Sequence, residues 1–471
     1  MLQENNLNLL VNFILSNSKN IKKFSDRFSI DSRSIKFGQV FISLDEDKLK
    51  NHKNIKHAVK NGASAFVSQF TYVRKDINTI IPFLISKDIK YIYYKLFFRD
   101  LLHYDHKPKV IGITGTDGKT STTLLLAQAL SSCNKKVGVI SSEGSGLFPS
   151  LKKNNYTTPT IDIIYKYYEK YLSKKCDYII IECSSQGLHQ GRVNGINFDY
   201  SLITNIYSDH LDYHENLNNY IKSKLLIIDQ SKSVILNHDS SILRKIKLSK
   251  YKGIKFNFIS NKINKNKNII KSSVYLDASK LKNFNYYSIL FIQIFMKLEN
   301  YKKDIIIKCI RNLKPLAGRR QIIKTKNKGT FIIDYAHTIQ SYENIYNDFI
   351  SNETITTLFG CGGDRDETKR EITGKIVDKF SSFIIITEDN SRTEEFNMIV
   401  KKILNGIKKK HKYKIIESRK KALDYLFKNS KHDDLNFILG KGNEDYLLKN
   451  NCEVRHNDIV YLKQLIYKYE N

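Results

Sequence analysis

Short apolar runs bounded by polar turns recur along the chain, and each predicts a short buried strand. Near the amino terminus, residues 40–44 and 65–67 are runs of this kind, with helical patches between them. The order then becomes an apolar strand at 109–114, a glycine turn at 115–119 and a helix at 120–131. Alternation of such strands with helices predicts an α/β fold, in which a mostly parallel sheet carries helices on both faces.

The alternation continues toward the carboxyl terminus. Residues 137–141 and 178–182 are further short strands, and a third unit begins near Pro315. The strands predicted in that unit are residues 330–334, 354–359, 382–387 and 436–439, with a helix after Lys369. The Lys- and Asn-rich stretch 245–282 interrupts the pattern and predicts irregular strands and loops at the surface.

Length and charge limit the classes of protein that this chain can be. At 471 residues it is too long for one core, so we expect three domains, at 1–107, 108–313 and 314–471. The formal charge of +31 would suit a nucleic-acid partner. The lysines are scattered, however, and accompany many Asn, Ile and Tyr, as an AT-rich genome would produce. Because nucleic-acid binding needs clustered charge, no such partner is expected.

Neither export nor membrane insertion is expected. The six cysteines contain no CxxC pair, so they predict neither a zinc site nor a disulfide framework, in agreement with a reducing cytosol. The first residues lack the pattern of a signal peptide. No stretch reaches the ~20 apolar residues that span a bilayer. These observations predict a soluble cytoplasmic protein without a membrane partner.

The strongest local signal is a glycine-rich turn between the strand at 109–114 and the following helix. Backbone amides at such a turn and at a helix start bind anions. Lys119 could reach the β- and γ-phosphates of a nucleotide, and the Thr120 hydroxyl could bind Mg²⁺. The spacing differs from the standard G-x-x-x-x-G-K-[ST], because the glycines are Gly112 and Gly115. The strand–turn–helix context nevertheless favours a phosphate loop over a chance GKT.

Two acidic segments follow apolar strands and offer oxygen ligands. Glu182 ends the strand at 178–182, near the ligand crevice of an open sheet, and could complete the shell of a phosphate-bound Mg²⁺. Asp209, His210, Asp212 and His214 lie within six positions. This cluster lacks the partner ligands that zinc needs. A hydrogen-bonded turn and a functional site are equally compatible with it.

Together these motifs resemble the Mur ligase family, within which the resemblance is to the enzymes that join meso-diaminopimelate, or L-lysine in some bacteria, to UDP-N-acetylmuramoyl-L-alanyl-D-glutamate. The motifs occur in the family's order over residues 31–444. They are DSRSIKFGQVF (31–41), GTDGKTS (115–121), YTTP (156–159), ECSS (182–185), TNIYSDHLDYH (204–214), AGRRQ (317–321), DYAHT (334–338), FGCGGDRD (359–366), DNSR (389–392) and GKGNE (440–444).

The resemblance implies a three-domain ligase with a Rossmann-like carboxyl-terminal domain, which uses ATP and Mg²⁺ to form an amide bond through an acyl phosphate. Domain 1–107 would bind the UDP end of the substrate, 108–313 the ATP, and 314–471 the incoming amino acid. Small molecules are then its substrates, and a monomer is expected. Closure of the domains would exclude water from the acyl phosphate.

Residue roles follow from the resemblance at matching positions only. The UDP-substrate set is Ile30, Ser32, Arg33, Thr157, Thr158, Ser184, Gln190 and Arg192. The ATP set is Gly115, Thr116, Asp117, Gly118, Lys119, Thr120, Ser121, Asn237, Arg319 and Asp334. Metal and catalytic roles fall on Lys119, Thr120, Glu182, His210 and Lys224, and Lys224 matches a lysine that is carbamylated in the family. The nearby Lys222 is its competitor. The amino-acid set is Arg365, Asp389, Asn390, Ser391, Arg392, Gly440 and Glu444.

Arg392 favours diaminopimelate over lysine, because a guanidinium binds a distal carboxylate in bidentate fashion. The alternative is that Arg392 pairs with Glu394 or Glu395. Five positions depart from the family pattern: Phe37, Gln186, Arg320, Ser391 and Asn443. The last four of these departures bear on the choice of amino acid more than on the chemistry. Two other classes stay open, a folyl- or polyglutamate-type ligase of the same superfamily and a basic nucleic-acid-binding NTPase.

Overall fold

The computed structural model describes residues 2–19, 21–72, 80–154, 156–260, 269–270, 281–349, 354–408, 412–450 and 452–470. The chain divides into two compact units, and neither is a single continuous segment. The first unit consists of Met1–Pro108, Pro159–Asp177 and Gly191–Asn197. The second consists of Lys109–Thr158, Tyr178–Gln190 and Phe198–Asn471.

A four-stranded parallel sheet forms the first unit, in the order β1-β2-β3-β4. Its strands are β1 (Phe28–Ser29), β2 (Val40–Ile42), β3 (Ala65–Ser68) and β4 (Phe83–Ile85), and its helices are α1 (Leu2–Asn17), α2 (Lys48–Lys60), α4 (Ile89–Ile92), α5 (Tyr94–Phe98) and α7 (Ile161–Ser173), with short 3₁₀ turns at Phe24–Arg27 and Arg99–Leu101. Val40 and Ile42 join one apolar cluster and Phe41 joins another. Both faces of this sheet are therefore covered, as side-chain alternation along a strand requires.

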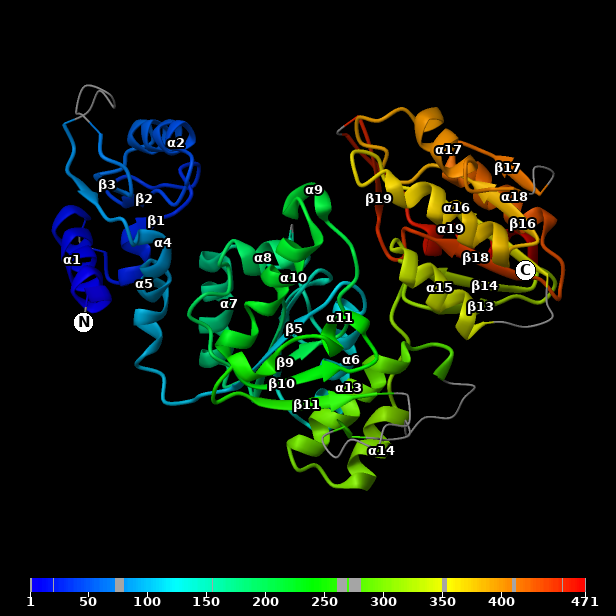
Figure 1. Ribbon diagram of the computed structural model, residues 1–471, viewed down its shortest axis with the longest axis horizontal. Coiled ribbons are helices and arrows are strands. Elements are labelled where there is room, and N and C mark those ends of the chain that lie inside the picture. Colours follow the sequence, from blue (N-terminus) through cyan, green and yellow to red (C-terminus); the bar gives the residue numbers. More distant parts are fainter. Residues whose placement is uncertain are drawn as a thin grey trace. The chain divides into compact units, whose positions relative to one another are not determined.

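The second unit holds two larger sheets and a two-stranded one. The first has eight strands in the order β12-β11-β10-β9-β5-β8-β6-β7; β5, β9, β10 and β11 are labelled in Figure 1. Its strands are β5 (Lys109–Thr114), β6 (Val137–Ser141), β7 (Gly144–Leu147), β8 (Tyr178–Glu182), β9 (Phe198–Ile203), β10 (Ser231–Asn237), β11 (Lys255–Ile259) and β12 (Ile269–Ile270). Only the β6–β7 pair is antiparallel. One apolar cluster packs α6 (Lys119–Ser132), α13 (Tyr286–Leu298) and α14 (Lys303–Arg311) on this sheet.

Several shorter helices of the second unit follow the strands of this sheet. They are α8 (Ser185–His189), α9 (Leu211–His214), α10 (Leu217–Leu225) and α11 (Ser241–Arg244), with 3₁₀ turns at Ile228–Gln230 and Leu248–Lys250. α8 comes directly after β8, and α9 and α10 come after β9. The carboxyl ends of parallel strands meet at one edge of a sheet, so these helices begin beside the end of β5, where ligands bind in open α/β sheets.

The second sheet of this unit has six strands in the order β13-β14-β18-β15-β16-β17, antiparallel only between β13 and β14. They are β13 (Gln321–Lys324), β14 (Thr330–Asp334), β15 (Ile355–Phe359), β16 (Phe383–Ile386), β17 (Tyr413–Ile415) and β18 (Leu435–Leu439). Helices α15 (Ile339–Asp348), α16 (Thr368–Phe380) and α17 (Phe396–Leu404) cover one face, and α18 (Arg419–Asn429) and α19 (Asp458–Glu470) cover the other. A hairpin of β19 (Tyr446–Lys449) and β20 (Cys452–Arg455) lies between β18 and α19 in sequence.

The predicted α/β fold with mostly parallel sheets is confirmed. The strands predicted at 109–114, 137–141, 178–182 and 330–334 have the observed bounds. The pattern missed β10 and the largely buried helix α13, whose apolar run has no polar face to mark its period. Of the stretch 245–282, the structure describes β11 and β12 at the edge of the first sheet, and residues 261–268 and 271–280 lie outside the described residues.

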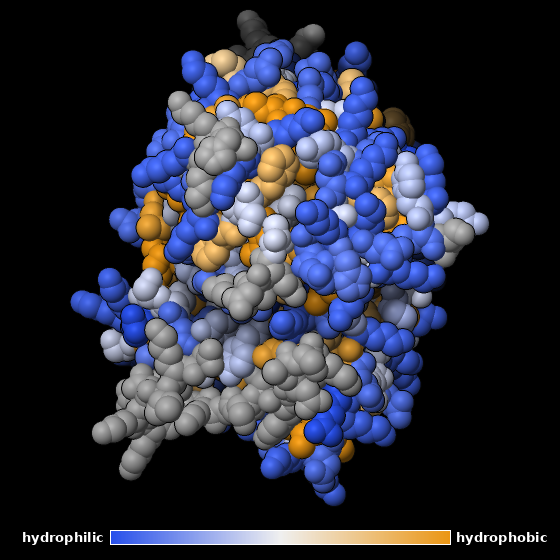
Figure 2. Space-filling model, turned by 90° about the vertical axis from the view of Figure 1, so that its right-hand side faces the viewer, coloured by the Kyte–Doolittle hydropathy of each residue, from blue (hydrophilic) through white to orange (hydrophobic). Residues whose placement is uncertain are grey.

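No described helix combines the length and the apolar character needed to span a membrane. The face drawn in Figure 2 is covered mainly by hydrophilic side chains, with apolar ones in separate places. Single exposed apolar residues are normal on a globular protein.

Candidate functional site

The phosphate loop connects the end of β5 to the start of α6. Gly115 (φ 149°) and Gly118 (φ 80°) have backbone conformations that favour glycine. A Cβ on Gly115 would lie 1.8 Å from Thr204 Oγ1, so a side chain does not fit there. Lys119 Nζ donates to Gly115 O (3.0 Å) and Thr116 O (2.8 Å), which holds the ammonium beside the loop. Loop amides, a helix start and an ammonium together form an anion site.

Side chains at the end of the neighbouring strand β9 hold this loop in shape. Asn205 Oδ1 accepts from the amides of Thr116 (3.2 Å) and Asp117 (2.9 Å), and Thr204 Oγ1 donates to Asp117 O (2.6 Å). The Thr116 hydroxyl lies 2.9 Å from the Tyr220 hydroxyl. The loop is therefore fixed before any ligand binds. Sequence reasoning did not single out Asn205 or Tyr220.

Glu182 stands beside the first turn of α6, as the sequence predicted. The carboxylate is fully buried, and its Oε1 accepts from Thr120 Oγ1 (2.9 Å). Its Oε2 accepts from the amide and the hydroxyl of Ser142 (3.0 and 3.1 Å). A buried carboxylate and a hydroxyl next to a phosphate loop are the oxygen donors that Mg²⁺ prefers. Within the described part of the chain, no three His, Cys, Asp or Glu side chains already surround one metal position.

Lys224 lies in the interior behind the phosphate loop. Its side chain is buried, its Nζ donates to Gly115 O (2.5 Å), and it sits 4.6 Å from the centre of the Tyr220 ring. Burial, followed by the nearby charge of Lys119, holds the pKa of Lys224 well below that of an ordinary lysine. Lys222 is exposed. Of the two competing lysines, Lys224 is the one whose side chain contacts the glycine loop.

His210 and Asp209 form the part of the acidic cluster that faces the phosphate loop. His210 adopts a left-handed backbone (φ 52°), and its Nε2 is 3.5 Å from Asp209 Oδ2. Burial lowers the pKa of His210 to about 4, so its ring is neutral near pH 7 and has a lone pair for a ligand. Burial would raise the pKa of Asp209, but nearby positive charge, including Lys369 Nζ at 2.5 Å, holds it below its usual range.

The residues matched to the UDP-substrate divide between the two units. In the second unit, Thr158 Oγ1 donates to Glu182 O (2.8 Å) and accepts from Ser184 N (2.9 Å), so this pair adjoins the metal-ligand candidate. Gln190 Nε2 donates to the Tyr213 hydroxyl (2.9 Å), and Thr157 is half-buried. In the first unit lie Ile30, Ser32, Arg33 and Arg192.

Within the first unit, the segment that carries Ser32 and Arg33 is ordered by its own side chains. Arg33 Nε and Nη2 each donate to one carboxylate oxygen of Asp31 (2.9 Å), and the Ser32 hydroxyl lies 3.1 Å from His57 Nδ1. The hydrogen bonds from Arg33 hold the pKa of Asp31 below its usual range. Phe37, where proline is usual, is exposed, and Lys19 Nζ lies 4.0 Å from its ring centre.

Two of the remaining nucleotide candidates, Asn237 and Asp334, lie at the ends of β10 and β14, and Arg319 precedes β13. Asn237 is buried and its Oδ1 accepts from Asp239 N (3.0 Å). The Arg319 guanidinium stacks on Tyr335, 4.2 Å from the ring centre. Asp334 Oδ2 accepts from Arg320 N (2.8 Å), and burial raises the pKa of Asp334. Ser121 follows Thr120 in the first turn of α6.

Three polar side chains of the carboxyl-terminal sheet converge around the buried Lys441. Its Nζ donates to Asn390 Oδ1 (2.9 Å), pairs with Glu444 Oε2, and lies 3.8 Å from Asp389 Oδ1. Asn390 Nδ2 donates to the same Glu444 oxygen (3.0 Å). Gly440 (φ 107°) brings its backbone close to Asp389, since a Cβ there would lie 2.6 Å from Asp389 Oδ2. Sequence reasoning named all of these except Lys441.

The Arg392 side chain is directed at carbonyl oxygens. Its Nη1 donates to Gly363 O (2.5 Å) and Asn390 O (3.3 Å), and no described carboxylate lies within 4.0 Å of it. Glu394 is instead held by Arg370, through two bonds of 2.6 Å. Pairing of Arg392 with Glu394 or Glu395, the alternative considered from sequence, is therefore wrong. Arg370 takes that carboxylate because it reaches Glu394 from α16, in bidentate geometry.

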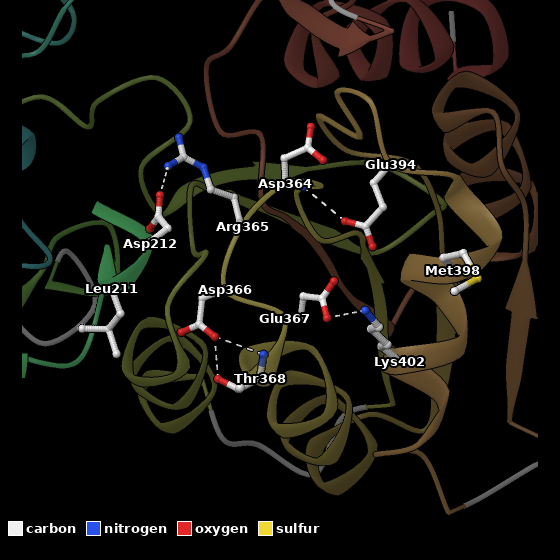
Figure 3. Close-up of a pocket in the computed structure, with 10 residues that line it drawn as sticks. All are labelled: Leu211, Asp212, Asp364, Arg365, Asp366, Glu367, Thr368, Glu394, Met398 and Lys402. Carbon is white, nitrogen blue, oxygen red and sulfur yellow. Dashed lines mark hydrogen bonds and ion pairs between the residues drawn. The ribbon is translucent and has the colours of Figure 1, made fainter. Parts of the chain in front are cut away.

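An open pocket of about 670 Å³ lies beside this region and includes Arg365 (Figure 3). Arg365 Nη1 points toward Asp212 Oδ2 at 3.2 Å, while Lys402 pairs with Glu367. The full lining is Leu211, Asp212, Asp364, Arg365, Asp366, Glu367, Thr368, Glu394, Met398 and Lys402. Most of its carboxylates already have hydrogen-bonding or ion-pair partners among these residues.

Comparisons with known proteins agree with this arrangement. A sequence model of the Mur ligase middle domain matches residues 113–301, and one of the Mur ligase glutamate ligase domain matches residues 318–442. The UDP-N-acetylmuramoyl-L-alanyl-D-glutamate–2,6-diaminopimelate ligase of Buchnera aphidicola subsp. Baizongia pistaciae is 32% identical, over 93% of this chain and 93% of the relative. The chain belongs to the Mur ligase family.

Two further proteins extend the similarity over almost the whole chain. The ligase of the same name from Clostridium botulinum is 30% identical over 98% of this chain and 99% of its own. A solved UDP-N-acetylmuramoyl-L-alanyl-D-glutamate–2,6-diaminopimelate ligase has a TM-score of 0.66 at 25% identity, covering 98% and 99% of the two chains. A MurF ligase from Thermotoga maritima in complex with ADP shares the fold, with a TM-score of 0.58 at 16% identity, over 95% of this chain and 98% of that one.

Some of the residues that the structure brings together were identified from sequence motifs, and others were not. Lys119, Thr120, Glu182, His210 and Lys224 converge around the phosphate loop. Ser142 was missed because it follows β6, which carries no motif of its own. Thr338 was also missed: its Oγ1 donates to Asp117 Oδ2 (2.7 Å), so the DYAHT segment contacts the phosphate loop directly. This contact joins residues 221 positions apart, so no local sequence pattern could have identified it.

Proposed function

We propose that this chain is an ATP-dependent ligase that adds meso-diaminopimelate to UDP-N-acetylmuramoyl-L-alanyl-D-glutamate in the synthesis of the peptidoglycan precursor. The observation that carries the proposal is the convergence of a phosphate loop, a buried glutamate and a buried low-pKa lysine at the end of β5. The named relatives that cover nearly all of this chain support the choice of substrates.

ATP is the proposed phosphate donor, with Mg²⁺ as its counter-ion. The amides of residues 115–121 and Lys119 would hold the phosphates, and Asn237, Arg319 and Asp334 would contact the rest of the nucleotide. The Thr120 hydroxyl and the Glu182 carboxylate fit Mg²⁺, and the neutral His210 would add a third ligand. When bound, the ion would neutralise phosphate charge. Phosphoryl transfer depends mainly on such positioning and charge neutralisation.

Lys224 is proposed to carry a carbamate. Burial lowers the pKa of Lys224, which favours the neutral amine, the form whose nitrogen lone pair can attack CO₂. A C–N bond then forms and the nitrogen loses a proton, which gives an anionic carbamate. The product offers oxygen atoms beside Gly115, where an unmodified lysine offers none. Oxygen ligands are those that Mg²⁺ prefers.

The proposed chemistry has two steps. A D-glutamate carboxylate oxygen attacks the γ-phosphorus of ATP, the bond to ADP breaks, and an acyl phosphate forms. The amine of diaminopimelate then attacks the acyl carbon, phosphate leaves, and the nitrogen loses a proton as the amide forms. Thr158, Ser184 and Gln190 would bind the muramoyl-dipeptide beside Glu182, with Thr157 and Arg192, while Ile30, Ser32 and Arg33 would bind the UDP end.

Asp389, Asn390, Ser391, Arg392, Gly440, Glu444 and Arg365 are the proposed amino-acid pocket. The acidic and amide groups around Lys441 would bind the α-amino end, and the two arginines would bind carboxylates. Arg392 supports diaminopimelate over L-lysine because no described carboxylate occupies its guanidinium. A distal carboxylate could replace the carbonyl contacts with a charge-assisted pair.

Domain roles and location follow from the same proposal. Residues 1–107 would bind the UDP end, 108–313 the ATP, and 314–471 the amino acid. Both UDP-linked substrate and ATP are metabolites of the cytoplasm, so the enzyme is proposed to act there, as a monomer.

An amino-acid panel tests the function directly. Purified enzyme is incubated with ATP, Mg²⁺, UDP-muramoyl-dipeptide and one of meso-diaminopimelate, L-lysine, D-lysine or L-ornithine, and ADP and tripeptide are measured. We expect both products with diaminopimelate. A parallel reaction with dihydropteroate and L-glutamate controls for the folyl-type alternative. Preference for L-lysine would overturn the amino-acid assignment, and ADP release only with the folate substrate would overturn the function.

A further inference from the structure

Behind the amino-acid pocket lies an arginine that none of the proposed roles uses. Arg419 begins α18 and Asp458 begins α19, and both side chains are completely buried. Arg419 Nε donates to Asp458 Oδ1 (2.9 Å) and its Nη2 donates to Oδ2 (2.8 Å). His456 Nε2 lies 2.7 Å from Asp458 Oδ1. The pair is thus bidentate and supported from a third side.

The Arg419 guanidinium also donates to two backbone carbonyls. Its Nη1 donates to Glu388 O (3.2 Å), and its Nη2 donates to Leu439 O (3.0 Å). The Arg419 amide also donates to Glu388 Oε1 (3.2 Å). Glu388 directly precedes Asp389, and Leu439 directly precedes Gly440. The two carbonyls therefore mark the start of both pocket loops, 389–392 and 440–444.

These two loops are not neighbours in the sheet. Their strands, β16 and β18, are separated by β15 in the order β18-β15-β16, so no ladder hydrogen bond joins them. A guanidinium is a flat, rigid fork with five donors, which suits it to fix two acceptors at a set spacing. Within the described residues, Arg419 is the side chain that bonds to both carbonyls.

Stability alone does not explain why a charged pair sits here. Replacing a buried ion pair by packed apolar residues is often neutral or stabilising. α18 and α19 already share an apolar cluster with Leu423, Leu426 and Leu462. A geometric role accounts for the retained charge, because apolar side chains cannot donate to carbonyls.

We propose that Arg419 is a positioning residue of the amino-acid pocket, which holds the loops 389–392 and 440–444 at the spacing that the incoming amino acid requires. The inference rests on the proposed function for the identity of the ligand, but not for the contact with the loops. Asp458 and His456 orient the guanidinium. Arg419 itself does not touch the substrate.

The test compares Arg419→Lys and Arg419→Met with a matched control, Leu423→Ala. Leu423 lies on the same helix and is buried, but it belongs to the apolar cluster and contacts neither carbonyl. Arg419→Lys keeps the charge toward Asp458 but loses the fork. Steady-state kinetics give the KM for diaminopimelate, ATP and UDP-muramoyl-dipeptide separately. Hydrogen–deuterium exchange follows the amides of Glu388 and Gly440, which are bonded to Glu417 O and Asp334 O.

For Arg419→Lys we expect the KM for diaminopimelate to rise about tenfold, as for loss of a charge-assisted hydrogen bond, with the other two KM values unchanged. Exchange at the two loops should rise in the same variant. Leu423→Ala should lower the melting temperature without either effect. If Arg419→Met does not fold, Arg419→Lys carries the test.

Unchanged loop exchange in Arg419→Lys overturns the proposal, and so does faster exchange with an unchanged KM for the amino acid. Equal rises in all three KM values also overturn it, since they indicate a general loss of structure. If the wild-type protein ligates no amino acid of the panel, the proposed function fails instead. The exchange data then still decide whether Arg419 holds the loops.

Discussion

The phosphate loop and the amino-acid pocket differ in what holds their polar groups in position. The loop is built from one short segment whose glycines and helix start place the amides, with support from Thr204 and Asn205 on the next strand. The pocket is assembled from loops after β14, β15, β16 and β18, and side chains far apart in sequence join them. Local backbone geometry dominates the first site, and buried ionic contacts dominate the second.

The departures from the family pattern are spread over the chain, and two of them, Phe37 and Gln186, lie outside the pocket loops. No departure falls in the phosphate loop, where Gly115 has no room for a side chain. Ser391 and Asn443 both fall in the pocket loops, and Arg320 precedes β13. Arg370, Arg419 and Lys441 hold the pocket loops from behind through buried contacts, so single residues of these loops can change while the frame is kept. The substrate preference is thus the property most open to change.

The largest expected effect is on the phosphate loop. Lys119→Ala removes the ammonium from the phosphate site, and we expect ligation to fall by about a hundredfold to a thousandfold or more. The melting temperature should stay within a few degrees, because Lys119 contacts only loop carbonyls. Lys252→Ala, at an exposed lysine of the same unit, is the control. Near-normal turnover in Lys119→Ala would show that this loop does not hold the transferred phosphate.

Loss of the carbamate should come next. Lys224→Ala is expected to be nearly inactive, and a short carboxylic acid such as formate or acetate should restore part of the activity by supplying oxygen atoms in the vacated space. Intact-protein mass spectrometry of the wild type should show an added CO₂ that is absent in the variant. Lys222→Ala, two positions away and exposed, should retain full activity. An active wild-type enzyme without the added mass would contradict the assignment.

An intermediate effect, confined to one substrate, is expected at Arg392. Arg392→Ala deletes the proposed partner of the distal carboxylate, and loss of one member of such a pair costs ~2–5 kcal/mol, or roughly 30-fold or more in affinity for diaminopimelate. L-lysine has no distal carboxylate and should lose almost nothing. Kinetics with both amino acids separate the cases. An equal loss for both would mean that Arg392, through Gly363 O and Asn390 O, only shapes the loop.

Sequence reasoning succeeded where a site is local. The strand, the glycine turn and the helix around Lys119 follow one another within a few residues, so their pattern predicted the geometry. Lys224 could also be separated from Lys222 by helix periodicity, because Tyr220, Ser223 and Lys224 fall on one face of α10 and all are buried.

Sequence reasoning failed where partners come from distant elements. Arg370 and Glu394 are 24 positions apart, and nothing in the pattern favours Arg370 over Arg392 as the partner of Glu394. Arg419 and Asp458 carry no motif, and a charged residue at a helix start is normally read as exposed. The first unit also includes residues 159–177 and 191–197, and this assignment depends on tertiary packing that no local pattern shows.

The smallest expected effect is on stability at acid pH, and it tests whether the buried Arg419–Asp458 pair stabilises the region behind the pocket. Burial would raise the pKa of Asp458, but the charge of Arg419 and hydrogen bonds from Arg419 and His456 hold it well below its usual range. The unfolded chain then binds more protons than the folded one below about pH 5, so the free energy of unfolding falls as the pH drops. Above the unfolded pKa the contribution is complete.

Urea unfolding at pH 5 and pH 3 measures this contribution. For the wild type, Asp458 should account for a loss of about 1 kcal/mol between these two pH values, since one pKa unit corresponds to 1.36 kcal/mol. Asp458→Asn should be less stable at pH 7 but should lack that part of the acid dependence. Asp433→Asn, at an exposed carboxylate, should keep the wild-type dependence. If Asp458→Asn and the wild type lose the same free energy of unfolding between pH 5 and pH 3, the Arg419–Asp458 pair does not cause the acid sensitivity. The pocket loops would then be held mainly by apolar packing, and buried ionic contacts would not distinguish the pocket from the phosphate loop.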